Sequence, residues 1–471
     1  MEVPVGRGVY CNRTLNLRSV RAIGYDMDYT LIHYHVDVWE ERAYEYTRAN
    51  LAAQGWPVAD LRFDPGSVIR GLAIDTKLGN LVKANRFGYV KRGYHGTKAM
   101  DFDAQRQAYS RDIVDLGESR FRFLNTLFSL SEACIYGQLV DLLDAGALPG
   151  RMSYEDLYER VRGALDWAHL EGKLKAEIVA DPDRFVAYDK EAPLALLDQK
   201  HAGKRLMLIT NSEWSYTRQI MERAFDPFLP GDMTWRELFE IVIVSARKPL
   251  FFTSPERLYE VADLAGEGLM RPVLDFVKGA VHHGGNAEQV EQWLGLDPAR
   301  ILYVGDHLYG DVHVSKQVRR WRTGLVLREL EGDLEALRDY RPRQRKLLDM
   351  MRTKEELELE MSDERLYAQR ARKRYGPPPP GSQKAHEERM QSLRARLVEL
   401  DQLITPLAIE AGALHNERWG LLMRAGNDKS LLTRSVERHA DIYMSRVSNF
   451  LFQTPFTFFR SPRGSLPHDQ E

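Results

Sequence analysis

The segment GYDMDYT, residues 24–30, places two aspartates, Asp26 and Asp28, one residue apart directly after an apolar run. Neighbouring carboxylates repel each other unless a cation or a proton neutralises them. Magnesium prefers hard oxygen ligands and often binds one or two carboxylates together with a substrate phosphate. An aspartate can also act as a nucleophile and form an aspartyl-phosphate. The pair therefore indicates metal-assisted chemistry at a phosphate group.

A second acidic segment, GDHLYGD, contributes Asp306 and Asp311. Lys248 adds a compact positive charge in a third segment. Acids that bind a metal and a lysine that binds phosphate are the parts of a phosphoryl-transfer site, where positioning and charge neutralisation supply most of the catalysis. Each pattern alone also occurs in ordinary turns, so the prediction depends on all of them meeting at one place.

The segment TNS, Thr210–Ser212, supplies the neutral part of the site. Thr210, Asn211 and Ser212 offer hydroxyl, amide and backbone N–H donors. We expect them at the N-terminus of a helix, where backbone N–H groups bind anions. These residues are therefore predicted to bind the phosphate.

Each of these polar segments follows its own apolar run, which we interpret as a buried parallel strand. The runs are Val20–Tyr25, Arg205–Ile209, Phe239–Val244 and Arg300–Val304. Helical patterns lie between most of them, such as Asn286–Leu294, which has an N-capping Asn286 and a terminating Gly295. Strand, polar loop and helix in repetition predict an α/β fold with a doubly wound parallel sheet, in which ligands bind at the carboxyl ends of the strands.

The first two strands are separated by about 170 residues, far more than a crossover connection needs. We therefore expect residues 1–34 and 184–330 to form the core, with an inserted cap domain at residues 35–183. The remaining region, residues 331–471, is predicted to contain a helical hairpin and C-terminal helices. In its second helix an apolar seam recurs at spacings of three and four, formed by Leu393, Leu397, Leu400, Ile404 and Leu407. We expect this region to be an oligomer contact, so that the protein is a homo-oligomer (dimer or tetramer).

The composition excludes several classes of protein. The 471 residues carry 66 basic and 68 acidic side chains, and this balance gives no general attraction to nucleic acid or anionic membranes. No apolar run approaches the roughly 20 residues that span a bilayer. Two cysteines do not make a disulfide framework or a zinc site, and the N-terminus lacks the apolar stretch of a signal peptide. We expect a cytoplasmic protein without nucleic-acid or membrane partners.

With these motifs in their order, the sequence resembles the haloacid dehalogenase-like (HAD) superfamily, and within it the cytosolic purine 5′-nucleotidases. The likeness extends beyond the four motifs to most of the chain. It includes the segments RGLAIDTKLGNLVK, FLNTLFSL, VRGALDWAHLEGKLK, SARKPLFF and ERHADIYMSRVSNFL. It is weakest in the charged hairpin.

The resemblance implies that Asp26 is the nucleophile and Asp28 the general acid and base. It implies Mg²⁺ as the cofactor, bound by Asp26, by the backbone carbonyl of Asp28 and by Asp306. Asp311 would act through a water of the metal or by orienting Lys248.

For the substrate, the resemblance implies that Thr210, Asn211, Lys248 and Lys175 bind the phosphate.

The resemblance further assigns Arg162, Asp166 and His169 to recognition of the nucleoside. Their spacing of four and three residues places them on one face of a helix. From the residues alone, an ordinary surface ion pair between Arg162 and Asp166 is the alternative. The family also has a Phe–Asn pair that stacks on the base, and the nearest match in this sequence is GYHG, with Tyr94 and His95.

The expected function is thus Mg²⁺-dependent hydrolysis of purine nucleoside 5′-monophosphates such as IMP or GMP through an aspartyl-phosphate, with phosphotransfer to a nucleoside as a possible side activity. Two alternatives stay open at this point. One alternative is a HAD phosphatase for another small phosphate ester, and the other is a binding or scaffold protein without catalysis.

Overall fold

The computed structural model describes residues 3–170, 172–264, 269–377, 380–462 and 464, with the side chains of residues 167–170 excepted. Two compact units are formed by this chain. Residues 1–331 and 422–471 make up the first, and residues 332–421 the second.

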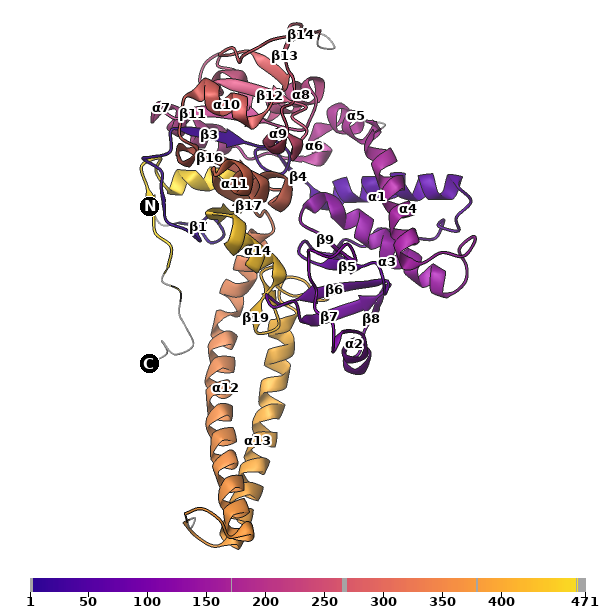
Figure 1. Cartoon of the computed structure of the whole chain (residues 1–471), viewed down its shortest axis with the longest axis vertical. Coiled ribbons are helices and arrows are strands. Elements are labelled where there is room, and N and C mark those ends of the chain that lie inside the picture. Colours follow the sequence, from indigo (N-terminus) through magenta and orange to yellow (C-terminus); the bar gives the residue numbers. More distant parts are fainter. Residues whose placement is uncertain (1–2, 171, 265–268, 378–379, 463, 465–471) are drawn as a thin grey trace. The chain divides into compact units, whose positions relative to one another are not determined.

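A ten-stranded sheet forms the centre of the first unit (Figure 1). Its strands follow the order β1 (Val9–Cys11), β20 (Ile442–Met444), β17 (Arg322–Val326), β16 (Ile301–Gly305), β3 (Ala22–Tyr25), β11 (Arg205–Ile209), β12 (Ile241–Val244), β15 (Val281–Gly284), β13 (Leu258–Val261) and β14 (Met270–Pro272). From β20 to β15 every neighbouring pair is parallel. The four strands predicted from the sequence are β16, β3, β11 and β12, and they lie side by side.

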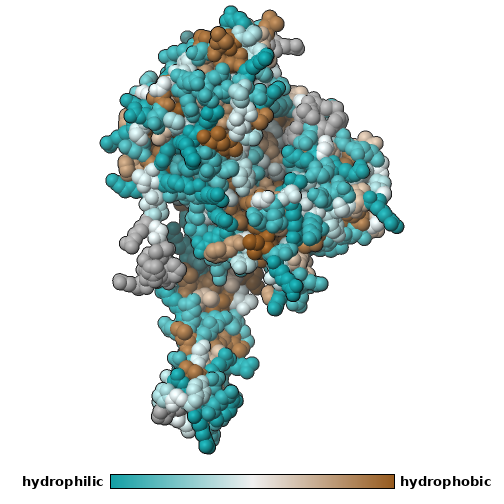
Figure 2. All heavy atoms as spheres, viewed as in Figure 1, coloured by the Kyte–Doolittle hydropathy of each residue, from teal (hydrophilic) through white to brown (hydrophobic). Residues whose placement is uncertain are grey.

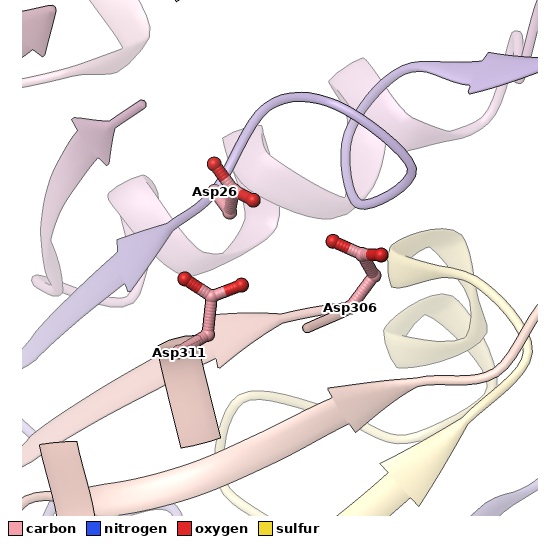
Figure 3. Close-up of side chains that lie close together, drawn as sticks. All are labelled: Asp26, Asp306 and Asp311. Carbon is pink, nitrogen blue, oxygen red and sulfur yellow. The ribbon is translucent and has the colours of Figure 1, made fainter. Parts of the chain in front are cut away.

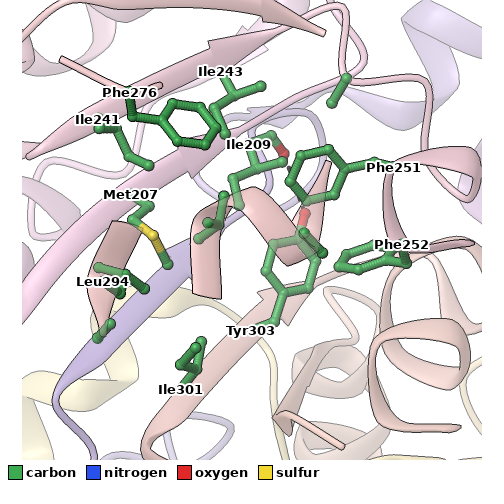
Figure 4. Close-up of a cluster of buried hydrophobic side chains, with 14 of the residues drawn as sticks. Met207, Ile209, Ile241, Ile243, Phe251, Phe252, Phe276, Leu294, Ile301 and Tyr303 are labelled. Carbon is green, nitrogen blue, oxygen red and sulfur yellow. Dashed lines mark hydrogen bonds between the residues drawn. The ribbon is translucent and has the colours of Figure 1, made fainter. Parts of the chain in front are cut away.

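Apolar side chains explain why these four strands are central. The residues of β3 and β12 are buried throughout, as expected for central parallel strands that are covered on both faces. Met207, Ile209, Ile241, Ile243 and their neighbours pack into one cluster with aromatic rings from the segments that follow the strands (Figure 4). The helices of this part are α7 (Ala192–His201), α8 (Trp214–Phe225), α9 (Leu250–Thr253), α10 (Ala287–Leu294), α11 (Val314–Arg319) and α14 (Leu431–His439).

The predicted helix after Asn286 is present as α10. The side chain of Asn286 accepts a hydrogen bond from the backbone N–H of Gln289, and Oε1 of Gln289 accepts one of 3.2 Å from the backbone N–H of Asn286, which is a capping box. Gly295 ends the helix in the left-handed region, at φ 62°. The α/β fold class and the doubly wound parallel sheet predicted from the sequence are confirmed.

The insert begins and ends at a short antiparallel pair. β4 (His33–Tyr34) leads into it and β10 (Val186–Ala187) leads out, and Tyr34 lies opposite Val186. Its five-stranded sheet has the order β8 (Lys98–Ala99), β7 (Val90–His95), β6 (Asn80–Ala84), β5 (Ala73–Asp75) and β9 (Phe121–Phe123). Its helices are α1 (Val36–Ala53), α2 (Phe102–Tyr109), α3 (Leu130–Asp144), α4 (Tyr154–Leu170), α5 (Lys173–Ala180) and α6 (Pro182–Phe185).

The second unit is the predicted hairpin, made of α12 (Leu330–Lys373) and α13 (Gln383–Gly412) (Figure 1). Leu393, Leu397 and Leu400 of the predicted seam pack against Leu357 and Met361 of α12. The predicted single region 331–471 is wrong at its end, however. Residues 422–471 belong to the first unit, because β20 pairs with both β17 and β1 in the central sheet. In the part of the chain that the structure describes, we find no helix with the length and hydrophobicity of a membrane span.

Candidate active site

Three carboxylates meet at the carboxyl ends of β3 and β16 (Figure 3). Asp26 follows β3 directly and Asp306 follows β16, while Asp311 lies in the helical turn Leu308–His313. One oxygen from each carboxylate lies within 4.8 Å of the others, and all three residues are buried. A backbone hydrogen bond of 2.9 Å from Asp26 N–H to the carbonyl of Val304 fixes the two strand ends together.

Lys248 lies inside this cluster. Its Nζ is 2.6 Å from Oδ1 of Asp26, 2.8 Å from Oδ1 of Asp311 and 3.0 Å from the hydroxyl of Tyr303. Burial alone would lower the pKa of Lys248, but the carboxylates of Asp26 and Asp311 outweigh it and raise the pKa well above its usual value. The lysine is therefore a fixed positive charge beside the predicted nucleophile.

Two glycines make this packing possible. A Cβ on Gly24 would lie 2.8 Å from a ring carbon of Tyr303, which lies opposite it on β16. A Cβ on Gly305 would lie 2.5 Å from Oδ2 of Asp311. Real Cβ atoms do not approach so closely, so the small residues let Tyr303 reach Lys248 and let Asp311 fold back beneath its strand.

Asp28 does not join the carboxylate cluster, and its side chain is held by hydroxyl groups instead. Tyr34 donates a hydrogen bond to Oδ1, and Ser212 donates one of 2.6 Å to Oδ2. The hydroxyl of Tyr34 is also 2.9 Å from that of Tyr216. The side chain of Asp28 is thus oriented by Tyr34 at the start of the insert and by Ser212 of the loop after β11, while Tyr216 of α8 contacts Tyr34. Its predicted contact with a metal through the backbone carbonyl stays a prediction.

The residues predicted to bind phosphate meet at the same edge. The hydroxyl of Thr210 accepts a hydrogen bond of 3.0 Å from Ser212 N–H. Asn211 pairs with the backbone of Lys248, accepting from its N–H at 2.6 Å and donating to its carbonyl at 3.1 Å. These contacts join the loops after β11 and β12. The helix that follows, α8, begins at Trp214.

Lys175 reaches this edge from α5 of the insert. Its Nζ donates a hydrogen bond of 3.2 Å to Ser212 and lies 4.9 Å from the ring centre of Tyr216. Lys175 and Ser212 are 37 residues apart in the sequence, and Ser212 also donates a hydrogen bond to Asp28. A second lysine therefore lies near Asp28. This position agrees with a role in binding the phosphate.

Sequence reasoning missed two residues of the insert at the site. Arg70, whose side chain is 1% exposed, donates to the carbonyl of Asp306 at 3.0 Å and forms a two-pronged ion pair with Glu329. Thr126 lies 3.3 Å from Oδ2 of Asp306. Burial raises the pKa of Asp306 to about 7, Asp311 acts in the same direction, and Arg70 opposes them. Both residues lie in segments that the resemblance already singled out, RGLAIDTKLGNLVK and FLNTLFSL.

The donor set at the cluster fits a magnesium ion. Asp26, Asp306 and Asp311 offer hard carboxylate oxygens that lie close enough together to bind one ion. Figure 3 shows that the three carboxylate groups face a common space. Three buried carboxylates face one ammonium group, so negative charge is left over for a divalent cation.

The predicted nucleoside residues lie on α4. Arg162 is 3.4 Å from Asp166 and 3.1 Å from the buried Glu132 of α3. The side chains of Arg162 and Asp166 are 48% and 53% exposed, so both retain surface for a ligand. The side chain of His169 lies outside the described residues.

Tyr94 and His95 lie on β7 in the sheet of the insert. The ring nitrogens of His95 are 2.7 Å from Asn80 and 2.8 Å from Asp144, both residues of the insert. These partners hold His95 within the insert, and its role at the base, like that of Tyr94, stays a prediction.

Comparison with known proteins decides the family. The sequence model of the 5′ nucleotidase family matches residues 9–471 of this chain. This chain belongs to the 5′-nucleotidase family. Among its relatives, a 5′-nucleotidase domain-containing protein of Dictyostelium discoideum is 29% identical over 98% of this chain and 74% of its own length. The 5′-nucleotidase domain-containing protein 2 of Homo sapiens is 27% identical over 98% of this chain and 85% of its own length.

Solved structures similar to this member of the 5′-nucleotidase family include a predicted phosphoglycolate phosphatase of Haemophilus somnus. It has 14% identity and a TM-score of 0.28, covering 65% of this chain and 85% of its own. A β-phosphoglucomutase of Pyrococcus has 12% identity and a TM-score of 0.31, covering 66% and 88%. Family membership identifies the chain as a phosphohydrolase that acts on phosphate esters.

Proposed function

We propose that this enzyme hydrolyses purine nucleoside 5′-monophosphates, such as IMP or GMP, to nucleoside and phosphate with the aid of Mg²⁺. The observation that carries the proposal is the pairing of Lys248 with both Asp26 and Asp311 inside one buried cluster, with the side chain of Asp28 held by Tyr34 and Ser212. Family membership supports the nucleotide as the substrate class.

In the first step, an oxygen of Asp26 attacks the phosphorus atom and forms an aspartyl-phosphate. The bond between phosphorus and the 5′ oxygen of the nucleoside breaks, and the leaving oxygen takes a proton from Asp28. In the second step, Asp28 removes a proton from water, which attacks the phosphorus while the bond between phosphorus and the Asp26 oxygen breaks, and phosphate is released. Asp26 is thereby regenerated.

The charges around Asp26 support this role. Lys248 stays protonated between Asp26 and Asp311, so a positive charge is in place where negative charge spreads over the phosphoryl oxygens. Lys175, which already contacts Ser212, supplies a second one from the insert. Asp26, Asp306 and Asp311 would hold the Mg²⁺ ion, which when bound neutralises phosphate charge.

Base selection is assigned to the exposed face of α4. Arg162 offers donors and Asp166 an acceptor, and their ion pair is half exposed. Such a pair can complement the edge of a purine, which presents both donors and acceptors. Tyr94 can stack on a base, and we assign it this role together with His95, its neighbour on β7.

The first experiment replaces the nucleophile. Asp26→Asn should reduce Mg²⁺-dependent phosphate release from IMP by more than about a thousandfold, because the amide neither attacks phosphorus nor carries the charge. The far-ultraviolet circular dichroism spectrum should stay unchanged. Asp103→Asn, an exposed position on α2, is the matched control and should keep full activity. Near-normal turnover by Asp26→Asn would remove the nucleophile from the proposal.

The second experiment tests the substrate. Initial rates with AMP, IMP, GMP, CMP, UMP and sugar phosphates should favour purine nucleotides, and an added nucleoside acceptor would reveal phosphotransfer. Asp166→Ala should lower kcat/KM for IMP by about tenfold or more and leave hydrolysis of an aryl phosphate nearly unchanged. Equal losses on both substrates would remove Asp166 from base recognition, and a preference for sugar phosphates would favour the alternative phosphatase.

We also place the enzyme in the cytoplasm. Neither Cys11 nor Cys134 takes part in a disulfide, and structural disulfides are typical of oxidising compartments. A reducing compartment therefore agrees with the two thiols.

A further inference from the structure

A row of leucines lies on the outer surface of α12, in the second unit. Leu337, Leu348, Leu359 and Leu366 are 38%, 50%, 68% and 38% exposed. Their spacings are 11, 11 and 7 residues. With 3.6 residues per turn, these spacings keep all four within about 40° around the helix axis. We call this row the outer stripe. Hydrophobic side chains are visible among hydrophilic ones on the hairpin in Figure 2.

The outer stripe is distinct from the seam that joins the two helices. The seam residues of α12 are buried, with Leu357 6% exposed and Tyr340 3% exposed, and the hydroxyl of Tyr340 donates to the carbonyl of Leu407 on α13. Lys354 forms an ion pair of 2.6 Å with Asp401 of α13 on the same side. The apolar residues of the seam are therefore buried between α12 and α13, whereas the leucines of the outer stripe stay exposed.

The charges of α12 are divided along the helix, and they include Arg343, Glu360 and Glu364, which pair with residues of α13. Residues 343–352 contain four basic side chains and one acidic side chain, a net charge of +3. Residues 355–364 contain six acidic side chains and no basic one, a net charge of −6. The two segments are equal in length and adjoin the same point of α12, between Thr353 and Lys354. Such a helix is complementary to itself when its copy runs in the opposite direction.

We propose that the outer stripe is an interface with a second copy of this chain, in which the two α12 helices pack antiparallel around a two-fold axis near residues 353 and 354. A two-fold axis makes the contact self-complementary, so each residue meets the residue equally far on the other side of the axis. Leu348 then meets Leu359 of the second copy, and Leu359 meets Leu348. Leu366 meets the aliphatic part of Arg341, which can cover apolar surface.

The same register pairs opposite charges. Arg352 lies opposite Glu355 of the second copy, and Arg345 lies beside Asp363. All four side chains are exposed in the single chain. The contact extends from Leu337 to about residue 370, a length of about 50 Å at 1.5 Å per residue, and two such helices offer enough surface for a stable dimer.

Charge also distinguishes a second copy from other occupants. An anionic membrane would attract residues 343–352 but repel the six acids of residues 355–364. A parallel copy would place like charges together along the whole stripe. The antiparallel copy is the arrangement in which both halves are matched.

The test is sedimentation of the full chain over a range of concentrations. The native protein should form dimers or larger assemblies. Leu348→Glu with Leu359→Glu should raise the dissociation constant at this contact by at least about a hundredfold, because each leucine occurs twice in the interface. Leu403→Glu, 61% exposed on α13 and outside the stripe, is the matched control and should associate like the native chain. All these side chains are exposed, so the helical signal should not change.

A charge exchange tests the direction of the helices. Arg345→Asp alone and Asp363→Arg alone should each weaken association about tenfold or more. The two changes together should restore it, because the antiparallel register rebuilds both pairs with their charges exchanged. A native chain that sediments as a monomer at every concentration would overturn the proposal. Association that survives the double leucine change, or that the double charge exchange fails to restore, would overturn it as well.

Discussion

Tyr34 belongs both to the loop of Asp28 and to the first residues of the insert. Its hydroxyl donates to Oδ1 of Asp28, while Ser212 occupies Oδ2. Both oxygens of the proposed acid and base are therefore oriented by hydroxyl groups. Tyr34 lies on β4, where the chain passes into the insert. A shift of the insert would therefore change the position of the Tyr34 hydroxyl and the orientation of the Asp28 carboxylate.

We expect Tyr34→Phe to lower kcat about 10- to 100-fold, because hydrogen bonds to charged groups contribute about 1.5–3 kcal/mol. KM should change much less, since Tyr34 positions Asp28 and has no proposed contact with substrate. Tyr216→Phe is the matched control, because its hydroxyl contacts Tyr34 and not Asp28, and it should lose less activity. Steady-state kinetics with IMP measure both values. A rise in KM with unchanged kcat would contradict the positioning role.

The turn after β16 is the element on which the carboxylate cluster depends most. Asp311 accepts a hydrogen bond of 3.2 Å from His307 N–H and lies beneath Gly305. The side chain of Asp311 occupies the space that a Cβ on Gly305 would fill. The end of β16 and the turn after it therefore pack in direct contact.

Gly305→Ala should destabilise the fold by about 1–3 kcal/mol, as overpacking of a buried position does, and should also reduce activity by displacing Asp311. Gly163→Ala on α4 is the matched control. Nothing lies within 4 Å of its added Cβ, so the change should stabilise by about 0.5–1 kcal/mol. Denaturant unfolding followed by circular dichroism measures both. Equal stability of the two variants would contradict the close packing.

The same elements explain what could be predicted from the sequence. Asp26, Asp306 and Lys248 follow apolar runs, and strand ends meet at one edge of a parallel sheet, so their convergence was predictable. Tyr303 was not, because a tyrosine within a buried run looks like a core residue, and its hydroxyl contact to Lys248 depends on Gly24. The contact of Arg70 with Asp306 was not predicted, because it depends on how the insert packs against the core.

Strand β20 was missed for a local reason. It contains only three residues, Ile442–Met444, which is too short to show a period, and it follows a helix in a segment rich in charge. The last residues were therefore predicted as C-terminal helices in one region with the hairpin. Pairing with β17 and β1, which decides its place, is a long-range contact that local patterns do not contain.

Metal binding should be visible in the stability of the entire enzyme. The cluster holds three carboxylates and one ammonium group, so a divalent cation should relieve repulsion in the folded state and raise Tm. At a hundred times Kd, binding adds about 2.7 kcal/mol. Differential scanning fluorimetry with and without Mg²⁺ after treatment with a chelator measures the shift. Asp306→Asn should lose most of it, and a native chain that melts at the same temperature in both conditions would contradict the metal site.

The hairpin lies in sequence between β17 and β20, two parallel neighbours in the central sheet. The hairpin unit, residues 332–421, must therefore leave the ribosome before β20, which pairs with both β17 and β1. Until then β17 has an open edge, and β1, near the start of the chain, has no strand to pair with. In a newly made chain, β1 therefore pairs with its neighbour in the sheet only after the segment that follows the hairpin has been synthesised.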